Sequence, residues 1–123
     1  MDINEITGII VDRAMKVHSA LGPGLLESAY RRCLIHELQK NHLIVESEIS
    51  LPIVYDGLKI NAAYRVDIRV EKKVLVEIKA VEKVLPVHYA QLLSYLQLSG
   101  IRIGLLINFN VVRLKEGIKR MIR

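Results

Sequence analysis

Residues 65–79 decide the fold of this chain and read RVDIRVEKKVLVEIK. Apolar and charged residues alternate on both sides of a short polar segment, which is typical of two β-strands joined by a tight turn. Successive side chains of a strand lie on opposite faces. The apolar faces are therefore predicted to contain Tyr64, Val66, Ile68, Val70, Val74, Val76 and Ile78. The opposite faces are predicted to contain Arg65, Asp67, Arg69, Leu75, Glu77 and Lys79.

The turn determines which charged residues oppose one another. With the turn centred on Lys72, the two strands pair so that Asp67 lies directly across from Glu77. Directly opposed like charges destabilise a sheet, so two facing carboxylates need a compensating cation. A turn slipped by one residue would separate the two acids. The compensating cation could be one of three basic side chains, Arg65, Arg69 and Lys79. It could also be a bound divalent metal, because Mg²⁺ prefers hard oxygen ligands.

The composition describes one foldable domain. The chain has 123 residues, of which 51% are apolar and 25% charged, so we expect a single domain over residues 1–123 with its own core. The single cysteine, Cys33, excludes an intrachain disulfide and fits a reducing compartment. Residues 1–5 carry acids where a secretory signal needs bases, and no apolar run is long enough to span a bilayer. We therefore expect a soluble cytoplasmic protein with no membrane partner.

Positive charge is concentrated near the C-terminal end. The formal net charge is +5, and residues 113–123 carry five Lys or Arg residues against one acid, Glu116. A basic end suits a polyanionic partner such as nucleic acid. It is equally compatible with a solvated, charged terminus that has no ligand.

Apolar residues at helical spacing predict three helices, over residues 4–21, 25–40 and 86–99. Asn4 or Thr7 would cap the first helix, which ends at Gly22-Pro23-Gly24. In the second helix, Glu27 is placed to pair with Arg31 four residues on. The buried stripe of that helix is predicted to contain Leu26, Ala29, Tyr30, Cys33, Leu34 and Leu38.

Extended segments lie on either side of the third helix. Residues 43–54 and the strand from Leu58 onward are joined by a turn at Asp56-Gly57, and Pro52 indicates an edge strand or a bulge. Residues 101–109 are almost all apolar, which predicts a strand covered on both faces. Residues 111–114 are expected to add a short last strand. The order α-α-β-β-β-α-β predicts an α/β fold, with a mixed sheet flanked by helices.

The sequence contains no motif for a zinc site or for a nucleophilic cysteine or serine. The four histidines are not at zinc-ligand spacing with one another or with the cysteine. Cys33 lies on an apolar helix stripe, which favours a core thiol. No serine lies in a Gly-x-Ser-x-Gly elbow. The acids of the hairpin remain. Two carboxylates can hold a Mg²⁺ ion, and a nearby lysine can stabilise developing negative charge.

The spacing Asp67…Glu77-Ile78-Lys79 resembles the signature of the PD-(D/E)XK nuclease superfamily. The segment Gly24-Leu25-Leu26-Glu27-Ser28-Ala29-Tyr30 resembles the motif that names the GxxExxY proteins, a prokaryotic group placed in that superfamily. Two further segments, AQLLSYL at residues 90–96 and GLLINF at residues 104–109, resemble the third-helix motif and the last core strand of the same group.

The resemblance implies a restriction-endonuclease-like core and a set of site residues. Asp67 and Glu77 would be the metal ligands, and Glu27 would reach the metal from its helix. Lys79 would be the catalytic lysine, and Gln91 would lie on the helix that faces the site. The family motif would contribute Gly24, Glu27 and Tyr30, with Tyr30 beside Glu27. The implied cofactor is Mg²⁺, with Mn²⁺ as a substitute.

The first functional hypothesis is a Mg²⁺-dependent nuclease that hydrolyses phosphodiester bonds of DNA or RNA. The alternatives are a catalytically inactive nuclease-fold module that binds nucleic acid, and a homodimeric regulatory module. In the last case the charged face of the hairpin would be only a ladder of ion pairs between strands.

Overall fold

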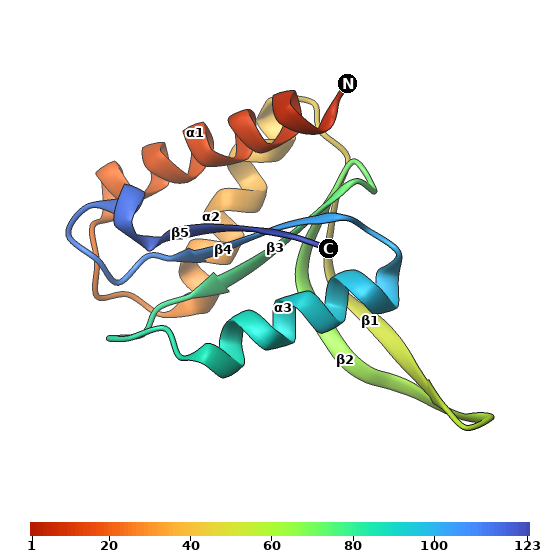
Figure 1. Ribbon diagram of the computed structural model, residues 1–123. Coiled ribbons are helices and arrows are strands. Elements are labelled where there is room, and N and C mark those ends of the chain that lie inside the picture. Colours follow the sequence, from red (N-terminus) through yellow and green to blue (C-terminus); the bar gives the residue numbers. More distant parts are fainter.

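A five-stranded mixed sheet forms the middle layer of the molecule, as the computed structural model of residues 1–123 shows (Figure 1). The sheet order is β1-β2-β3-β4-β5; β3 and β4 run parallel, and the other neighbours are antiparallel. The elements are α1 (Ile3–Leu21), α2 (Glu27–Lys40), β1 (Val45–Tyr55), β2 (Leu58–Val70), β3 (Val74–Lys79), α3 (Pro86–Ser99), β4 (Ile103–Asn108), a 3₁₀-helix (Leu114–Gly117) and β5 (Ile118–Ile122). The predicted fold class and element order are confirmed.

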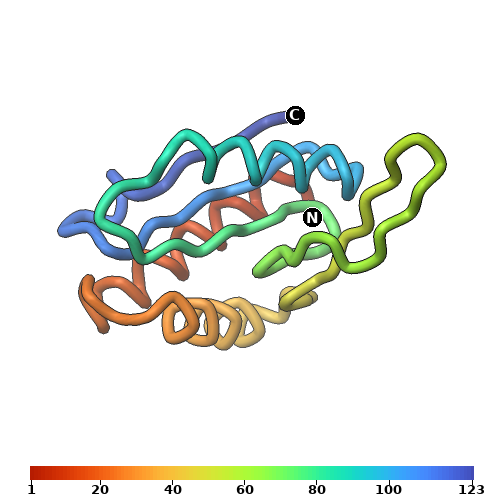
Figure 2. Tube along the Cα trace, turned by 90° about the horizontal axis from the view of Figure 1, so that it is seen from below, coloured from red at the N-terminus to blue at the C-terminus, as the bar shows by residue number.

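Two cores lie on opposite faces of this sheet. The larger core packs α1 and α2 against the Val74, Val76 and Ile78 side of β3, and the smaller core packs α3 against the Leu75 side. Figure 2 shows α3 on one side of the sheet, with α1 and α2 on the other. All six residues of β4 are buried, which confirms the prediction of a strand covered on both faces.

The β2–β3 hairpin has the predicted register. Val70 pairs with Val74 and Ile68 with Val76, so the turn is centred on Lys72. Glu71 and Lys72 have φ values of 52° and 54°, which gives the strands the tight reversal that the polar segment predicted. The ladder between β2 and β3 ends at Ile68 and Val76.

Beyond that point β2 leaves β3 and continues with β1 as a two-stranded arm, which projects from the body of the molecule (Figure 1). Ile68 belongs to the larger core, whereas Val66 belongs to the smaller one. The prediction that Tyr64, Val66, Ile68 and Val70 share one face is therefore wrong. The backbone of β1 has a positive φ of 51° at Glu48, opposite this point, and this irregularity changes what the arm contacts.

The turn residues of the arm were predicted correctly. Asp56 and Gly57 have φ values of 48° and 79° and join Tyr55 to Leu58, as an Asp-Gly hairpin turn requires. β1 is an edge strand, and its register shifts on either side of Pro52, which has no N–H to donate to a ladder.

Three local predictions were wrong. Asp2, rather than Asn4 or Thr7, caps α1, because its carboxylate accepts the N–H of Glu5 at 2.8 Å. Helix α2 begins at Glu27, so Leu26 precedes the helix and is 77% exposed instead of buried. The last strand lies at Ile118–Ile122, inside the basic segment, rather than over residues 111–114. No helix is both long and apolar enough to cross a bilayer.

Candidate active site

Two carboxylates take the place of the β2–β3 ladder where that ladder stops. The Asp67 Oδ2 atom accepts the N–H of Ile78 at 2.8 Å, and the Glu77 Oε1 atom accepts the N–H of Asp67 at 3.1 Å. Each acid thus binds the backbone of the opposite strand, and the two side chains lie side by side. The hairpin register brings them together, as the alternation of residues predicted.

Each of these carboxylates has one oxygen left over. Neither Oδ1 of Asp67 nor Oε2 of Glu77 accepts a hydrogen bond from the protein. Both oxygens keep some contact with solvent, because no fully buried side-chain oxygen lacks a hydrogen-bond partner. Two oxygens on adjacent strands are therefore free to bind a ligand.

Burial disfavours the charged form of both acids. Glu77 is only 8% exposed, and its burial, together with the charge of Asp67, raises its pKa to about 8. Burial also raises the pKa of Asp67. A buried carboxyl is normally stabilised as an anion by an ion pair or several hydrogen bonds. Here each acid has one hydrogen bond from the protein and no ion pair.

The structure narrows the list of compensating cations. Arg65 pairs with Glu48 at 3.1 Å, and Arg69 forms a two-pronged pair with Glu46 at 2.6 and 2.8 Å. Both arginines are therefore engaged with β1. Lys79 is half-buried and forms no ion pair, but its charge lowers the pKa of both acids against the larger effect of burial. Of the predicted cations, Lys79 and a bound metal remain as candidates. Arg31 of α2, which binds Glu48, also lowers the pKa of Asp67.

Helix α2 brings Glu27 to the end of β3. The Glu27 Oε1 atom accepts the N–H of Ala80 at 3.4 Å, and its charge adds to the burial that raises the pKa of Asp67 and Glu77. The predicted pair between Glu27 and Arg31 does not form, because Arg31 binds Glu48 at 3.0 Å. Glu27 is therefore directed toward the end of β3 rather than along its own helix.

Asn108 fixes the backbone that follows Lys79. Its buried amide donates to the carbonyl of Val81 at 2.9 Å and accepts the N–H of Val81 at 3.1 Å. The N–H of Phe109 donates to the carbonyl of Lys79 at 2.9 Å. The lysine therefore lies at a strand end whose backbone is held by residues at the end of β4. Asn108 was not predicted as a site residue, although a polar residue ending an apolar run was a usable signal.

Tyr95 of α3 is a second residue that the sequence interpretation missed. Burial raises the pKa of its phenol, and the charges of Glu77 and Asp67 raise it further, so the ring lies near both acids. It packs on Tyr64 with ring centroids 5.3 Å apart. Gln91 is one helical turn before Tyr95 and is exposed, with no hydrogen bond to the acids. The i, i+4 spacing of the two residues was the available signal.

Tyr30 shapes the loop in front of Glu27. Its buried hydroxyl donates to the carbonyl of Gly22 at 2.5 Å and accepts the N–H of Leu25 at 3.1 Å, while its ring stacks on Phe109 at 4.5 Å. Gly24, between these two contacts, has a φ of 99°, which a residue with a side chain rarely adopts. Gly24 and Tyr30 thus set the loop that presents the helix start.

We expect Tyr30→Phe to lower the free energy of unfolding by about 1–2 kcal/mol, because two backbone groups of the loop lose their partner while the ring stacking is kept. Chemical denaturation measures this change. The control is Tyr55→Phe, since Tyr55 is exposed and its hydroxyl has no partner in the protein. Equal stability of wild type and Tyr30→Phe would contradict the role given to the hydroxyl.

A model of the PD-(D/E)XK nuclease superfamily matches residues 4–121. The chain belongs to the PD-(D/E)XK nuclease superfamily. Its mixed sheet with flanking helices agrees with the restriction-endonuclease-like fold of that superfamily. No curated protein and no solved structure matches the chain significantly.

PD-(D/E)XK nucleases generally use divalent metal ions, and the donor set of this chain fits such an ion in part. Mg²⁺ keeps several waters and is held by one or two carboxylates together with substrate phosphates. The free oxygens of Asp67 and Glu77, and the absence of an ion pair to either acid, meet that requirement. Glu27 does not complete a set of three, since no three His, Cys, Asp or Glu side chains are arranged to hold a metal.

Proposed function

We propose that this superfamily member is a Mg²⁺-dependent nuclease that hydrolyses phosphodiester bonds of nucleic acid. The observation that carries the proposal is the pair of adjacent buried carboxylates, Asp67 and Glu77, each with one free oxygen and no ion pair. Burial of two like charges without an ion pair is costly, and a divalent cation would offset that cost.

Each site residue has a distinct role in this proposal. Asp67 and Glu77 would hold the ion, which when bound polarises a phosphate and acidifies water. The ammonium group of Lys79 stabilises negative charge as it develops on the phosphate. Glu27 supports the two acids from α2, and Gln91 orients the lysine or the phosphate from α3.

The subfamily of the chain is a further part of the proposal. We propose that the chain is a GxxExxY protein, on the basis of Gly24, Glu27 and Tyr30. A single nuclease-like domain over residues 1–123, a cytoplasmic location and Mn²⁺ as a substitute for Mg²⁺ stay predictions.

Purified protein is expected to cleave DNA or RNA in the presence of Mg²⁺ or Mn²⁺ and to lose this activity in EDTA. Labelled single- and double-stranded oligonucleotides of both kinds, resolved on denaturing gels, measure the products. The Asp67→Asn variant is the matched control for contaminating nucleases, because it keeps an oxygen for the N–H of Ile78. Equal cleavage by this variant, or no cleavage with any substrate and metal, would contradict the proposal.

A second candidate is a module that binds nucleic acid without cleaving it. It is favoured by the absence of a three-ligand metal cluster and by the exposed Lys119 and Arg120 on the edge strand β5. Binding would then persist in EDTA and weaken steeply with salt, because phosphate contacts release counterions. Binding that is absent, or insensitive to salt, would eliminate this candidate.

A further inference from the structure

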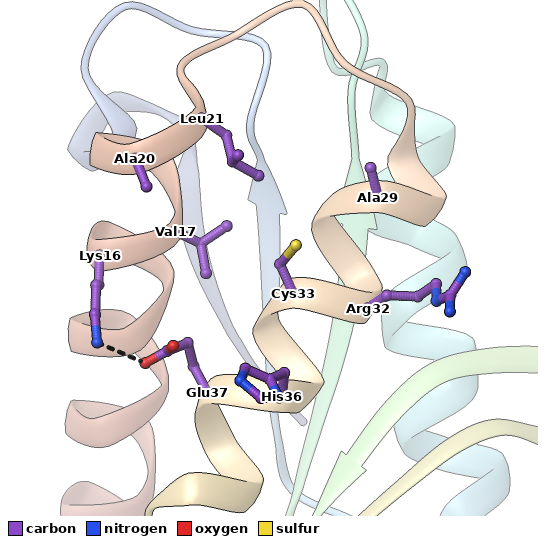
Figure 3. A pocket seen from close by; sticks show the side chains of 9 residues that line it. All are labelled: Lys16, Val17, Ala20, Leu21, Ala29, Arg32, Cys33, His36 and Glu37. Carbon is purple, nitrogen blue, oxygen red and sulfur yellow. Dashed lines mark ion pairs between the residues drawn. The ribbon is translucent and has the colours of Figure 1, made fainter.

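A groove of about 560 Å³ lies between α1 and α2, and none of the residues that line it belongs to the candidate site (Figure 3). Its floor is apolar and consists of Val17, Ala20, Leu21, Ala29 and Cys33. Figure 3 shows Val17 of α1 and Cys33 of α2 pointing into the space between the helices. Three of the floor residues are small, which leaves room for a large apolar side chain from outside.

The edge of the groove is positively charged. The buried carboxylate of Glu37 contacts Lys16 at 3.2 Å, Lys40 at 3.3 Å and Arg13 at 3.4 Å, and the contacts with Lys16, above all, and Lys40 lower its pKa. The one acid that lines the groove thus has three cations around it, of which Arg13 is shared with Asp12. Arg32 adds a further exposed cation that has no acidic partner.

Apolar surface continues past one end of the groove. Leu21 is partly exposed, and the loop that leads from α1 to α2 carries Leu25, 43% exposed, and Leu26, 77% exposed. Exposed leucines next to an apolar floor, bordered by charged residues, are typical of surfaces that bind another protein.

We propose that this groove binds an acidic amphipathic helix of another protein. Its apolar side chains would lie on the floor between α1 and α2, and its carboxylates would face Lys16 and Arg32. A helix that lies in a groove is a common mode of peptide recognition, in which apolar side chains three and four residues apart along the helix contact the groove. The charges of the groove select for acidic neighbours of these anchors.

The features of the groove favour this occupant over two others. A nucleic-acid backbone needs basic and polar contacts along its path, whereas the floor here is apolar and Glu37 lies at its side. A second copy of this chain carries the same net charge of +5. Two of its exposed apolar segments, α3 and the arm tip at residues 53–60, contain a single acid, Asp56. The proposal does not depend on nuclease activity.

Cys33 makes the test direct, because it is the only cysteine and lies in the groove. The probe is a synthetic helix with leucines on one face and glutamates on the other, added to the intact protein. At ten times its Kd, the probe should slow alkylation of Cys33 by iodoacetamide about tenfold. The same helix with lysines in place of the glutamates should give no protection.

Two neighbouring exposed positions of α1 provide matched variants. Ala20 lines the groove and Ser19 does not. Ala20→Glu should abolish protection by the acidic helix, and Ser19→Glu, with the same change of charge, should keep it. Circular dichroism confirms that both variants are folded.

Four results would overturn the proposal. The first two are absence of protection of Cys33 by the acidic helix and equal protection by the lysine helix. The third is equal protection in the two glutamate variants. The fourth is slower alkylation of Cys33 as the protein concentration is raised without any peptide. The last result would assign the groove to a second copy of the chain. Protection by a single-stranded oligonucleotide instead of the acidic helix would assign it to nucleic acid.

Discussion

Replacement of Lys79 by alanine is expected to lower Mg²⁺-dependent cleavage by about 100- to 1,000-fold, which is the usual effect of removing one group that stabilises transition-state charge. The charge of Lys79 lowers the pKa of both Asp67 and Glu77. Unlike Arg65 and Arg69, Lys79 forms no ion pair with a glutamate of β1. Its backbone is held at the end of β3 by the ladder to Asn108 and by the N–H of Phe109.

The fold should survive this replacement. Lys79 forms no ion pair and no side-chain hydrogen bond, and its hairpin is held by backbone pairing and two cores. Initial cleavage rates and thermal unfolding of the same preparations separate the two effects. Lys83→Ala is the control, because Lys83 is an exposed lysine in the loop that follows β3. Cleavage by Lys79→Ala at the wild-type rate would remove Lys79 from the mechanism.

The second large effect is on stability and its dependence on pH. The carboxyl of Glu77 has a pKa of about 8 in the folded protein, against an ordinary value of 4.5, chiefly because it is buried. Between these two pH values the folded protein keeps a proton that the unfolded chain releases. Stability must therefore fall as pH rises through this window. Burial raises the pKa of Asp67 too, which adds a loss of the same sign.

Glu77→Gln should remove most of this loss, because the amide stays neutral and its oxygen can still accept the N–H of Asp67. The raised pKa of Glu77 corresponds to a loss of up to about 5 kcal/mol in the free energy of unfolding of the wild type at pH 8 and above. The free energy of unfolding without metal, measured by urea denaturation from pH 5 to pH 9, gives the comparison. At pH 8 the variant is expected to be more stable than wild type, and inactive as a nuclease.

The exposed Glu82 provides the control for this measurement, since Glu82→Gln removes a carboxylate without changing a buried group. Its stability should follow the wild-type pH profile. If wild type and Glu77→Gln have parallel profiles between pH 5 and pH 8, then Glu77 titrates normally and the electrostatic account of the site is wrong.

The centre of the site was accessible from the sequence because it depends on local rules. A three-residue turn and a period of two determine that Asp67 and Glu77 lie opposite one another. No long-range contact is needed for that deduction. The turn at Asp56-Gly57 and the buried strand β4 were predictable for the same reason, since turn chemistry and continuous apolar character belong to short segments.

The residues that were missed depend on packing between distant segments. Tyr95 comes near the acids because α3 packs on the face of the sheet that carries Leu75. Arg31 binds Glu48 rather than Glu27 because α2 lies against β1. Val66 changes core because β2 departs from β3 to form the arm. None of these relations has a signature in the spacing of residues along the chain.

The basic segment was misread for a different reason. Lys119 and Arg120 were assigned to a charged terminus, whereas they belong to the edge strand β5, which pairs with β4. An edge strand exposes much of its surface, so it tolerates charges that an interior strand does not. Composition alone therefore does not distinguish it from a solvated tail.

The most direct test of the central claim is a crystal structure after a Mn²⁺ soak, with an anomalous difference map. A peak within coordination distance of the free oxygens of both Asp67 and Glu77 is expected, and it should vanish in crystals of Asp67→Asn treated in the same way. A map with no peak between these two acids at saturating Mn²⁺, while both still bind only backbone N–H groups, would contradict the claim that they share a metal ion.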